Sequence, residues 1–219
     1  MRVDYERNLK QLQDKVLSLG SMVENAITLS MDALKSRDTA LAQRVVKDDS
    51  LINEKRFEIE EDCIHLIATQ APMARDLRVI VAVLNVIIDL ERIGDHAAGN
   101  AKIAIMLGDE PPLKPLIDLP RMADKTADML RRAMDAFVRR DAVAARKVTE
   151  DDDEVDALYD QIFRELLYFM GEDPKTVNRA TRLIWAAHNL ERSADRVTNI
   201  CERVVFVVTG KQEEIGGKY

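Results

Sequence analysis

The chain repeats itself, and this repeat constrains the fold more than any other feature of the sequence. The motif LERIGD at residues 90–95 returns one hundred residues later as LERSAD at residues 190–195. Earlier in the chain, SMDA at residues 30–33 matches AMDA at residues 133–136, an offset of 103 residues. The offset shrinks because the second copy is three residues shorter in the turn before its last helix. Such self-similarity predicts two structurally similar halves.

Apolar residues at helical spacing predict long helices throughout both halves. The first segment carries an uninterrupted apolar stripe: Leu9, Leu12, Val16, Leu19, Val23, Ile27, Met31 and Leu34. Breaks at Pro and Gly, and a predicted N-cap at Asp38, divide the chain into helices at residues 4–36, 39–69, 73–107, 119–140, 142–170 and 174–209. No segment shows the alternation of a strand. We therefore expect an all-α protein made of two tandem three-helix bundles, with six helices in total.

Glycine and proline also place the boundary between the halves. Gly108 ends the third predicted helix, and a short, stiff linker follows it with Pro111, Pro112, Pro115 and Pro120. The first repeat is therefore predicted at residues 1–108 and the second at residues 118–210. Residues 211–219 are predicted to form a flexible tail.

Composition excludes several classes of protein. The net charge of −7 argues against a nucleic-acid partner, because phosphate binding requires a basic surface. The longest apolar run, residues 79–84, is much shorter than the roughly 20 residues that a membrane-spanning helix needs. Because no signal peptide opens the chain either, we expect a cytoplasmic protein. Cys63 and Cys201 have no metal-binding spacing and are expected to be buried thiols.

The acidic pair Glu91 and Asp95 lies four residues apart on one face of the third predicted helix. The pair continues an apolar stripe that we expect to be buried: Leu77, Val81, Leu84 and Ile88. The opposite stripe, which we expect to face solvent, carries Arg78, Asn85, Asp89 and His96. Carboxylates close to a core face are costly unless they are paired or bind a cation.

The pair Glu191 and Asp195 takes the same place in the last predicted helix, with His188 three residues before Glu191. The neighbouring antiparallel helix carries Asp152 and Asp156, so four carboxylates should face one another. Carboxylate ligands suit Mg, Ca, Mn or Fe, and His188 could add a nitrogen ligand. The sequence therefore predicts a metal site in the second half.

The first half is expected to hold a version of this site that is depleted or that binds metal differently. Asp49 and Asn53 take the places of Asp152 and Asp156, and the amide of Asn53 carries no charge. We therefore predict that the second-half site binds divalent or ferric ions more tightly than the first. The alternative is that the acids in both halves only form structural ion pairs with arginines such as Arg92.

Three motifs resemble those of PhoU proteins: ARDLR at residues 74–78, DLERIGDH at residues 89–96 and NLERSADRVTNI at residues 189–200. The resemblance extends over about residues 4–209. It implies the PhoU fold of two three-helix bundles, with multinuclear iron or zinc clusters at ExxxD motifs. Carried over to this chain, the metal role falls on Asp49, Glu91, Asp95, Asp152, Asp156, Glu191 and Asp195.

The resemblance also implies a regulatory function. PhoU proteins act in the cytoplasm as negative regulators of phosphate uptake, peripheral to membrane complexes. They connect the ATPase of the Pst phosphate transporter to the sensor kinase PhoR and hold signalling off when phosphate is plentiful. Long amphipathic helices with an exposed apolar remainder further predict a homodimer.

Three functional interpretations remain open at this point. The main one is a signalling adaptor without enzymatic activity, because no nucleophile–base pair or phosphate-binding glycine loop is evident. The second is a carboxylate-bridged, di-iron-like metal enzyme or a metal store, although the paired Glu-x-x-His motifs of that class do not occur. The third is a helical scaffold without metal.

Overall fold

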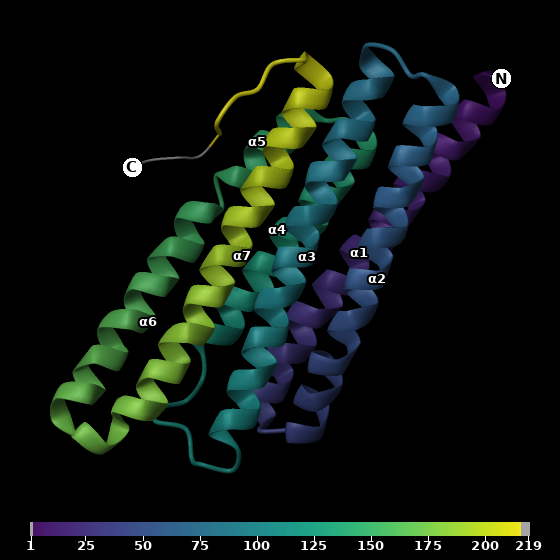
Figure 1. The fold of residues 1–219 in the computed structure, drawn as a ribbon. Helices are drawn as coiled ribbons and strands as arrows, with labels where there is room; N and C mark the ends of the chain where they lie inside the picture. Colours follow the sequence, from purple (N-terminus) through teal and green to yellow (C-terminus); the bar gives the residue numbers. More distant parts are fainter. Residues whose placement is uncertain (1, 216–219) are drawn as a thin grey trace.

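The computed structural model describes residues 2–215, and over that range the chain consists of helices joined by short loops (Figure 1). The helices are α1 (Arg2–Ser36), α2 (Thr39–Gln70), α3 (Arg75–Leu107), α4 (Asp118–Arg139), α5 (Ala142–Thr149), α6 (Asp152–Glu172) and α7 (Val177–Thr209), with a short 3-10 helix, η1 (Pro174–Thr176), before α7. No strand occurs between residues 2 and 215. The prediction of an all-α protein is therefore confirmed.

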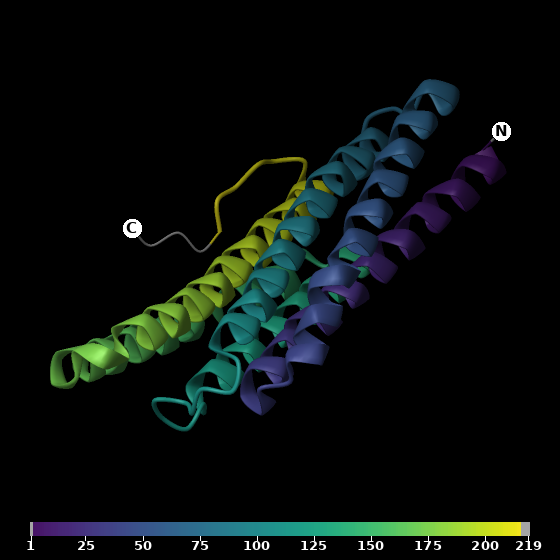
Figure 2. The same cartoon turned by 60° about the horizontal axis from the view of Figure 1, so that its bottom comes forward.

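Two three-helix bundles stand side by side, as the repeat predicts. The first contains α1, α2 and α3, and the second contains α4, α7 and the pair α5–α6. The halves meet where α3 packs on α7 and where α1 packs on α4. As a result α6, α7, α3 and α2 follow one another across one layer, and α1 and α4 lie behind it (Figures 1 and 2).

Equivalent residues begin the second helix of each half. Asp38 accepts a hydrogen bond from the backbone N of Leu41 at 2.9 Å, which confirms the predicted N-cap. Asp141, at the matching position of the repeat, accepts from the backbone N of Val143 and Ala144. An N-cap of this kind satisfies amide groups that the first turn of a helix leaves without partners.

One predicted helix is interrupted. The segment expected to be continuous over residues 142–170 ends at Thr149 and starts again at Asp152. The break falls within an acidic run, residues 150–154, whose like charges destabilise an uninterrupted helix. A new helix start places Asp152, Asp153 and Glu154 in a first turn, where the helix dipole favours negative charge. Arg132 and Lys125 of α4 form ion pairs with Asp151 at the break.

The core follows the predicted stripe of α1. All eight apolar residues of that stripe, from Leu9 to Leu34, are buried. Their burial against α2, α3 and α4 supplies much of the hydrophobic stabilisation of the first half. Cys63 and Cys201 are also buried and free, as predicted, and burial raises the pKa of each thiol to about 12.

The predicted core face of α3 is wrong. Leu77, Val81 and Ile88 are 38%, 39% and 43% exposed, and the buried residues of α3 instead include Val79, Val83, Val86, Ile87 and Leu90. Asp89, predicted to face solvent, is only 8% exposed. The reason is that α3 packs against α1, α2 and α7, so only its outer side, which carries Leu77 and Val81, remains open to solvent.

The described part of the tail contacts the second half. Glu213 forms an ion pair with Arg146 at 2.5 Å, and the backbone N of Ile215 donates to Glu202 at 3.1 Å. Residues 216–219 of the predicted tail lie outside the described residues. Among residues 2–215, no helix has the length and apolar character needed to cross a membrane.

Candidate metal centres

The second-half site lies between α6 and α7, which run antiparallel and pack against each other. Asp152 and Asp156 come from the start of α6, and Glu191 and Asp195 from the middle of α7. Asp152 Oδ1 and Glu191 Oε2 are buried and have no hydrogen-bond partner within residues 2–215. A buried carboxylate oxygen without a donor is costly, and a cation is one way to satisfy it.

Little positive charge offsets these carboxylates. The Nδ1 atom of His188 lies 3.4 Å from Glu191 Oε2, and the Nε atom of Arg192 lies 4.0 Å from Asp195 Oδ2. Burial, and then the charges of Asp156, Asp195 and Glu191, raises the pKa of Asp152 to about 7. Burial and then Asp195 raises the pKa of Glu191 to about 7 as well.

Protons and metal ions therefore compete for the second-half site. A carboxyl with a pKa near 7 is only partly ionised at neutral pH, and ionised oxygens are the ones that ligate a metal. A bound cation would supply the charge that keeps Asp152 and Glu191 ionised. The donor set and its unsatisfied oxygens fit such a cation.

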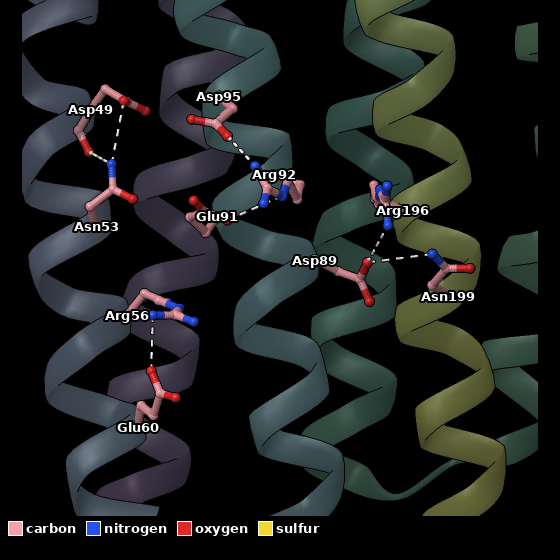
Figure 3. A network of polar contacts seen from close by, with 10 residues as sticks. All are labelled: Asp49, Asn53, Arg56, Glu60, Asp89, Glu91, Arg92, Asp95, Arg196 and Asn199. Atoms are coloured by element: carbon pink, nitrogen blue, oxygen red, sulfur yellow. Dashed lines mark hydrogen bonds and ion pairs between the residues drawn. The ribbon is translucent and has the colours of Figure 1, made fainter.

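The first-half site lies between α2 and α3, on the side of the layer away from α1 (Figure 3). Asn53 Nδ2 donates to the backbone O of Asp49 at 3.1 Å and to Asp49 Oδ2 at 3.4 Å. Arg92 pairs with Asp95 Oδ2 at 3.0 Å and with Glu91 Oε2 at 3.6 Å. Most of the carboxylates here already have partners from the protein, so this half fits a metal cluster less well than the second half.

Asp49 keeps one unsatisfied oxygen in the first half. Its Oδ1 atom is buried without a hydrogen-bond partner among the described residues. Burial and the charge of Asp95 raise the pKa of Asp49, whereas Lys102 lowers it. Throughout residues 2–215, no three His, Cys, Asp or Glu side chains converge in the arrangement of a closed metal site. Ligation at either site would therefore require the carboxylates to turn toward a common point.

A polar network that sequence reasoning missed lies between the two sites, where α3 crosses α7. Asp89 Oδ1 accepts hydrogen bonds from Arg196 Nη1 at 3.3 Å and from Asn199 Nδ2 at 3.4 Å (Figure 3). Asp89 and Arg196 each occur in only one copy of the extended motif, where the other copy has Asn189 and His96, and the sequence does not show which helix covers them. The network joins the two halves through a buried carboxylate.

Two further hydrogen bonds continue along the same crossing. His96 Nδ1 lies 3.2 Å from Ser193 Oγ, and Asn189 Nδ2 donates to Asn100 Oδ1 at 2.9 Å. The helix positions are related by the repeat, so that Asp89 corresponds to Asn189 and His96 to Arg196. Gly99 leaves room for Asn189, because a Cβ at that position would lie 2.9 Å from Asn189 Nδ2.

Comparison with known proteins identifies the family. The model of the PhoU domain matches twice, over residues 16–104 and 119–204, and together these segments cover most of the chain. The chain belongs to the PhoU family. Each match contains one of the two sites, so the PhoU domain and the sequence repeat describe the same unit.

Relatives match over almost the whole chain. The phosphate-specific transport system accessory protein PhoU homolog of Clostridium acetobutylicum is 39% identical over 96% of this chain and 97% of its own length. The crystal structure of PhoU from Pseudomonas aeruginosa has a TM-score of 0.90 with 36% identity, covering 94% of this chain and all of that one. The phosphate transport system regulatory protein PhoU from Streptococcus pneumoniae also superposes with a TM-score of 0.90, at 29% identity over 96% of this chain.

The structure thus brings the predicted site residues of this PhoU protein together in two groups. Asp152, Asp156, Glu191 and Asp195 share the space between α6 and α7, whereas Asp49, Glu91 and Asp95 share the space between α2 and α3. Ion pairs with arginine, the alternative that the sequence left open, also occur, at Arg92 and at Arg192. Metal ligation by these residues stays a prediction.

Proposed function

We propose that this chain is a cytoplasmic accessory protein of phosphate-specific transport that restrains phosphate uptake and starvation signalling. It would connect the ATPase of the Pst transporter to the sensor kinase PhoR and act as an adaptor without catalysing a reaction. The observation that carries the proposal is the end-to-end match to accessory and regulatory proteins of this transport system, at up to 39% identity.

The proposal includes a metal centre in the second half. Asp152, Asp156, Glu191 and Asp195 would hold a multinuclear cluster of iron or zinc, with Mg, Ca or Mn as other candidates, and His188 could contribute a nitrogen. Support comes from the buried oxygens of Asp152 and Glu191 that lack hydrogen-bond partners among residues 2–215. When bound, the metal supplies positive charge to this face of the protein.

The protein's own contribution is to keep four carboxylates close together while leaving them accessible. Packing of α6 on α7 fixes the backbone positions of both acidic pairs, and the apolar residues Val155 and Leu158 of α6 are buried beneath them. Charge on the outer side of the layer then depends on whether a cation is bound. We propose that partners recognise this difference in charge.

The test uses Glu191→Ala with Asp195→Ala in a strain that lacks the native protein. The protein is purified without added metal or chelator, its metal content is measured by mass spectrometry, and repression of phosphate-uptake genes is followed with a reporter. Asp160→Ala with Glu172→Ala, which removes two exposed carboxylates from α6, is the matched control. We expect only the first variant to lose metal and repression. Full repression by a metal-free, folded Glu191→Ala/Asp195→Ala variant would contradict the proposed link between metal and signalling.

The partners are tested separately. A pull-down from phosphate-replete cells should recover the transporter ATPase and the sensor kinase, and light scattering should show a homodimer. Recovery of neither partner would refute the adaptor role. The alternative, a di-iron-like oxidase or metal store, is distinguished by oxygen consumption of the iron-loaded protein, which an adaptor does not show.

A further inference from the structure

The repeat allows the two acidic sites to be compared position by position. With the offset of 103 residues, Asp49, Asn53 and Arg56 of α2 correspond to Asp152, Asp156 and Tyr159 of α6. The first residue is the same in both halves, but the other two differ in charge. An acid in the second half is replaced by an amide in the first, and a neutral phenol is replaced by a guanidinium.

Arg56 lies within the first-half site. Its side chain is only 20% exposed and extends from α2 toward α3 below Glu91 (Figure 3). Its Nη1 atom pairs with Glu60 Oε2 at 2.9 Å, and its guanidinium carbon lies 4.7 Å from the centre of the Phe57 ring. The Nε atom is buried without a hydrogen-bond partner among the described residues. Packing against Phe57 therefore holds a fixed positive charge beside the carboxylates.

The charge of Arg56 acts on the acids that the second half would offer to a metal. Burial and then Asp95 raise the pKa of Glu91, and the charges of Arg92 and Arg56 oppose this rise. Lys102 acts in the same sense on Asp49. Arg92, Arg56 and Lys102 thus all act on the first-half carboxylates, and Arg56 is also paired with Glu60.

The second half has no equivalent of Arg56. Tyr159 stands at that position and packs near His188, with ring centroids 6.1 Å apart. Arg192 repeats Arg92, but Arg196, the other guanidinium near Asp195, is paired with Asp89 of α3. Four carboxylates therefore retain an excess of negative charge, in contrast to the first half.

We propose that Arg56 is a built-in counter-cation that replaces the metal in the first half. The chain then has one metal centre, in the second half, and an arginine-neutralised counterpart whose structure does not depend on metal. This inference rests on the proposed metal binding of the second half. It goes further in assigning a role to Arg56 and in dividing the two halves into one that responds to metal and one that does not.

The proposal predicts that a metal site can be restored in the first half. The variant Asn53→Asp with Arg56→Tyr gives the first half the four carboxylates and the tyrosine of the second half. Its control, Gln43→Glu with Arg44→Tyr, makes the same change of net charge at exposed positions of the same helix. Zn²⁺ bound per chain is measured by mass spectrometry after dialysis, and Zn²⁺ affinity by titration calorimetry.

We expect the Asn53→Asp/Arg56→Tyr variant to bind about twice the Zn²⁺ of the wild type, and the control variant to bind the same amount as the wild type. Site-specific loss identifies the half: Asp156→Asn/Asp195→Asn should remove the Zn²⁺ of the wild type, and Asp49→Asn/Asp95→Asn should not. No gain in the first variant, or equal losses in the last two, would overturn the proposal.

A second measurement tests Arg56 whether or not the wild-type protein binds metal. Arg56→Met keeps an unbranched apolar stem but removes the guanidinium and its charge. In EDTA we expect the melting temperature of this variant to fall by several degrees, and Zn²⁺ added in excess of the EDTA to restore it by binding the uncompensated acids. An unchanged melting temperature in EDTA would show that Arg56 is not a counter-cation. The wild-type protein could instead bind no Zn²⁺ while Arg56→Met still lowers the melting temperature by the expected amount. That result would refute the proposed metal centre and leave the role of Arg56 as a counter-cation standing.

Discussion

Replacing Asp152 by Asn should stabilise the protein in EDTA at pH 8. A carboxyl whose pKa rises from 3.8 to about 7 on folding costs about 4 kcal/mol of folding free energy above pH 7 if the group is fully buried. Asp152 keeps partial contact with solvent and interacts with four other carboxylates, so the realistic cost is about 1–2 kcal/mol. Asn has the same shape without the charge and therefore removes most of this cost.

The sign of the pH dependence follows from proton binding. Between pH 4 and about pH 7 the folded state holds a proton on Asp152 that the unfolded state has released. The contribution of Asp152 to stability is therefore greatest in acid and is lost as the pH rises through about 7. The stability difference between Asp152→Asn and the wild type should accordingly grow from pH 5.5 to pH 8.

The assay is urea unfolding in EDTA at both pH values, with the exposed substitution Asp160→Asn as control. Taking the difference between variant and wild type cancels the titration of all other groups that the substitution does not touch. With saturating Zn²⁺ the effect should reverse, because the variant has then lost a ligand. Destabilisation by Asp152→Asn in EDTA at pH 8 would refute the idea that uncompensated charge dominates this site.

Three further predictions concern the rest of the fold. Burial, and then Arg192, lowers the pKa of His96 to about 4. The contribution of neutral His96 to the free energy of unfolding should therefore be lost as the pH falls from 6.5 toward 4. His96→Gln should make this fall in the free energy of unfolding smaller, as measured by urea titrations. Leu19→Ala should cost about 2–5 kcal/mol because Leu19 is fully buried, whereas Val81→Ala, at a half-exposed position, should cost less than about 1 kcal/mol in the same assay. Asp141→Ala removes an N-cap and should lower the free energy of unfolding by about 1 kcal/mol, and an unchanged value would show that the cap is redundant.

The repeat and the spacing of apolar residues were sufficient to predict most of the fold. The stripe of α1 is buried throughout, and the N-cap at Asp38 lies where it was expected. These features depend on local sequence and on one dominant packing face. The sequence does not predict the break between α5 and α6, because the helical spacing of apolar residues continues across it. The acidic run that causes the break lies within this continuous pattern.

The candidate sites were harder to predict because they depend on which helices become neighbours. The sequence places Glu91 and Asp95 on one face of α3, but it does not show that this face points away from the core. The burial of Asp89 follows from the packing of α3 on α7, which joins residues 107 positions apart. The neutralising role proposed for Arg56 becomes visible only when its position beside Glu91 is known.

The Asp89 network also determines which halves can pair. In a symmetric pair of identical units every interface contact occurs twice. Each interface residue therefore meets residues of the same sequence that it belongs to. Two copies of residues 1–108 arranged like α3 and α7 would place each Asp89 opposite His96 and Gly99, where this chain has Arg196 and Asn199. Each carboxylate would then be buried without a guanidinium, which costs about 3–5 kcal/mol. The Asp89 network therefore disfavours a pair of two first halves and favours the pairing of a first half with a second half.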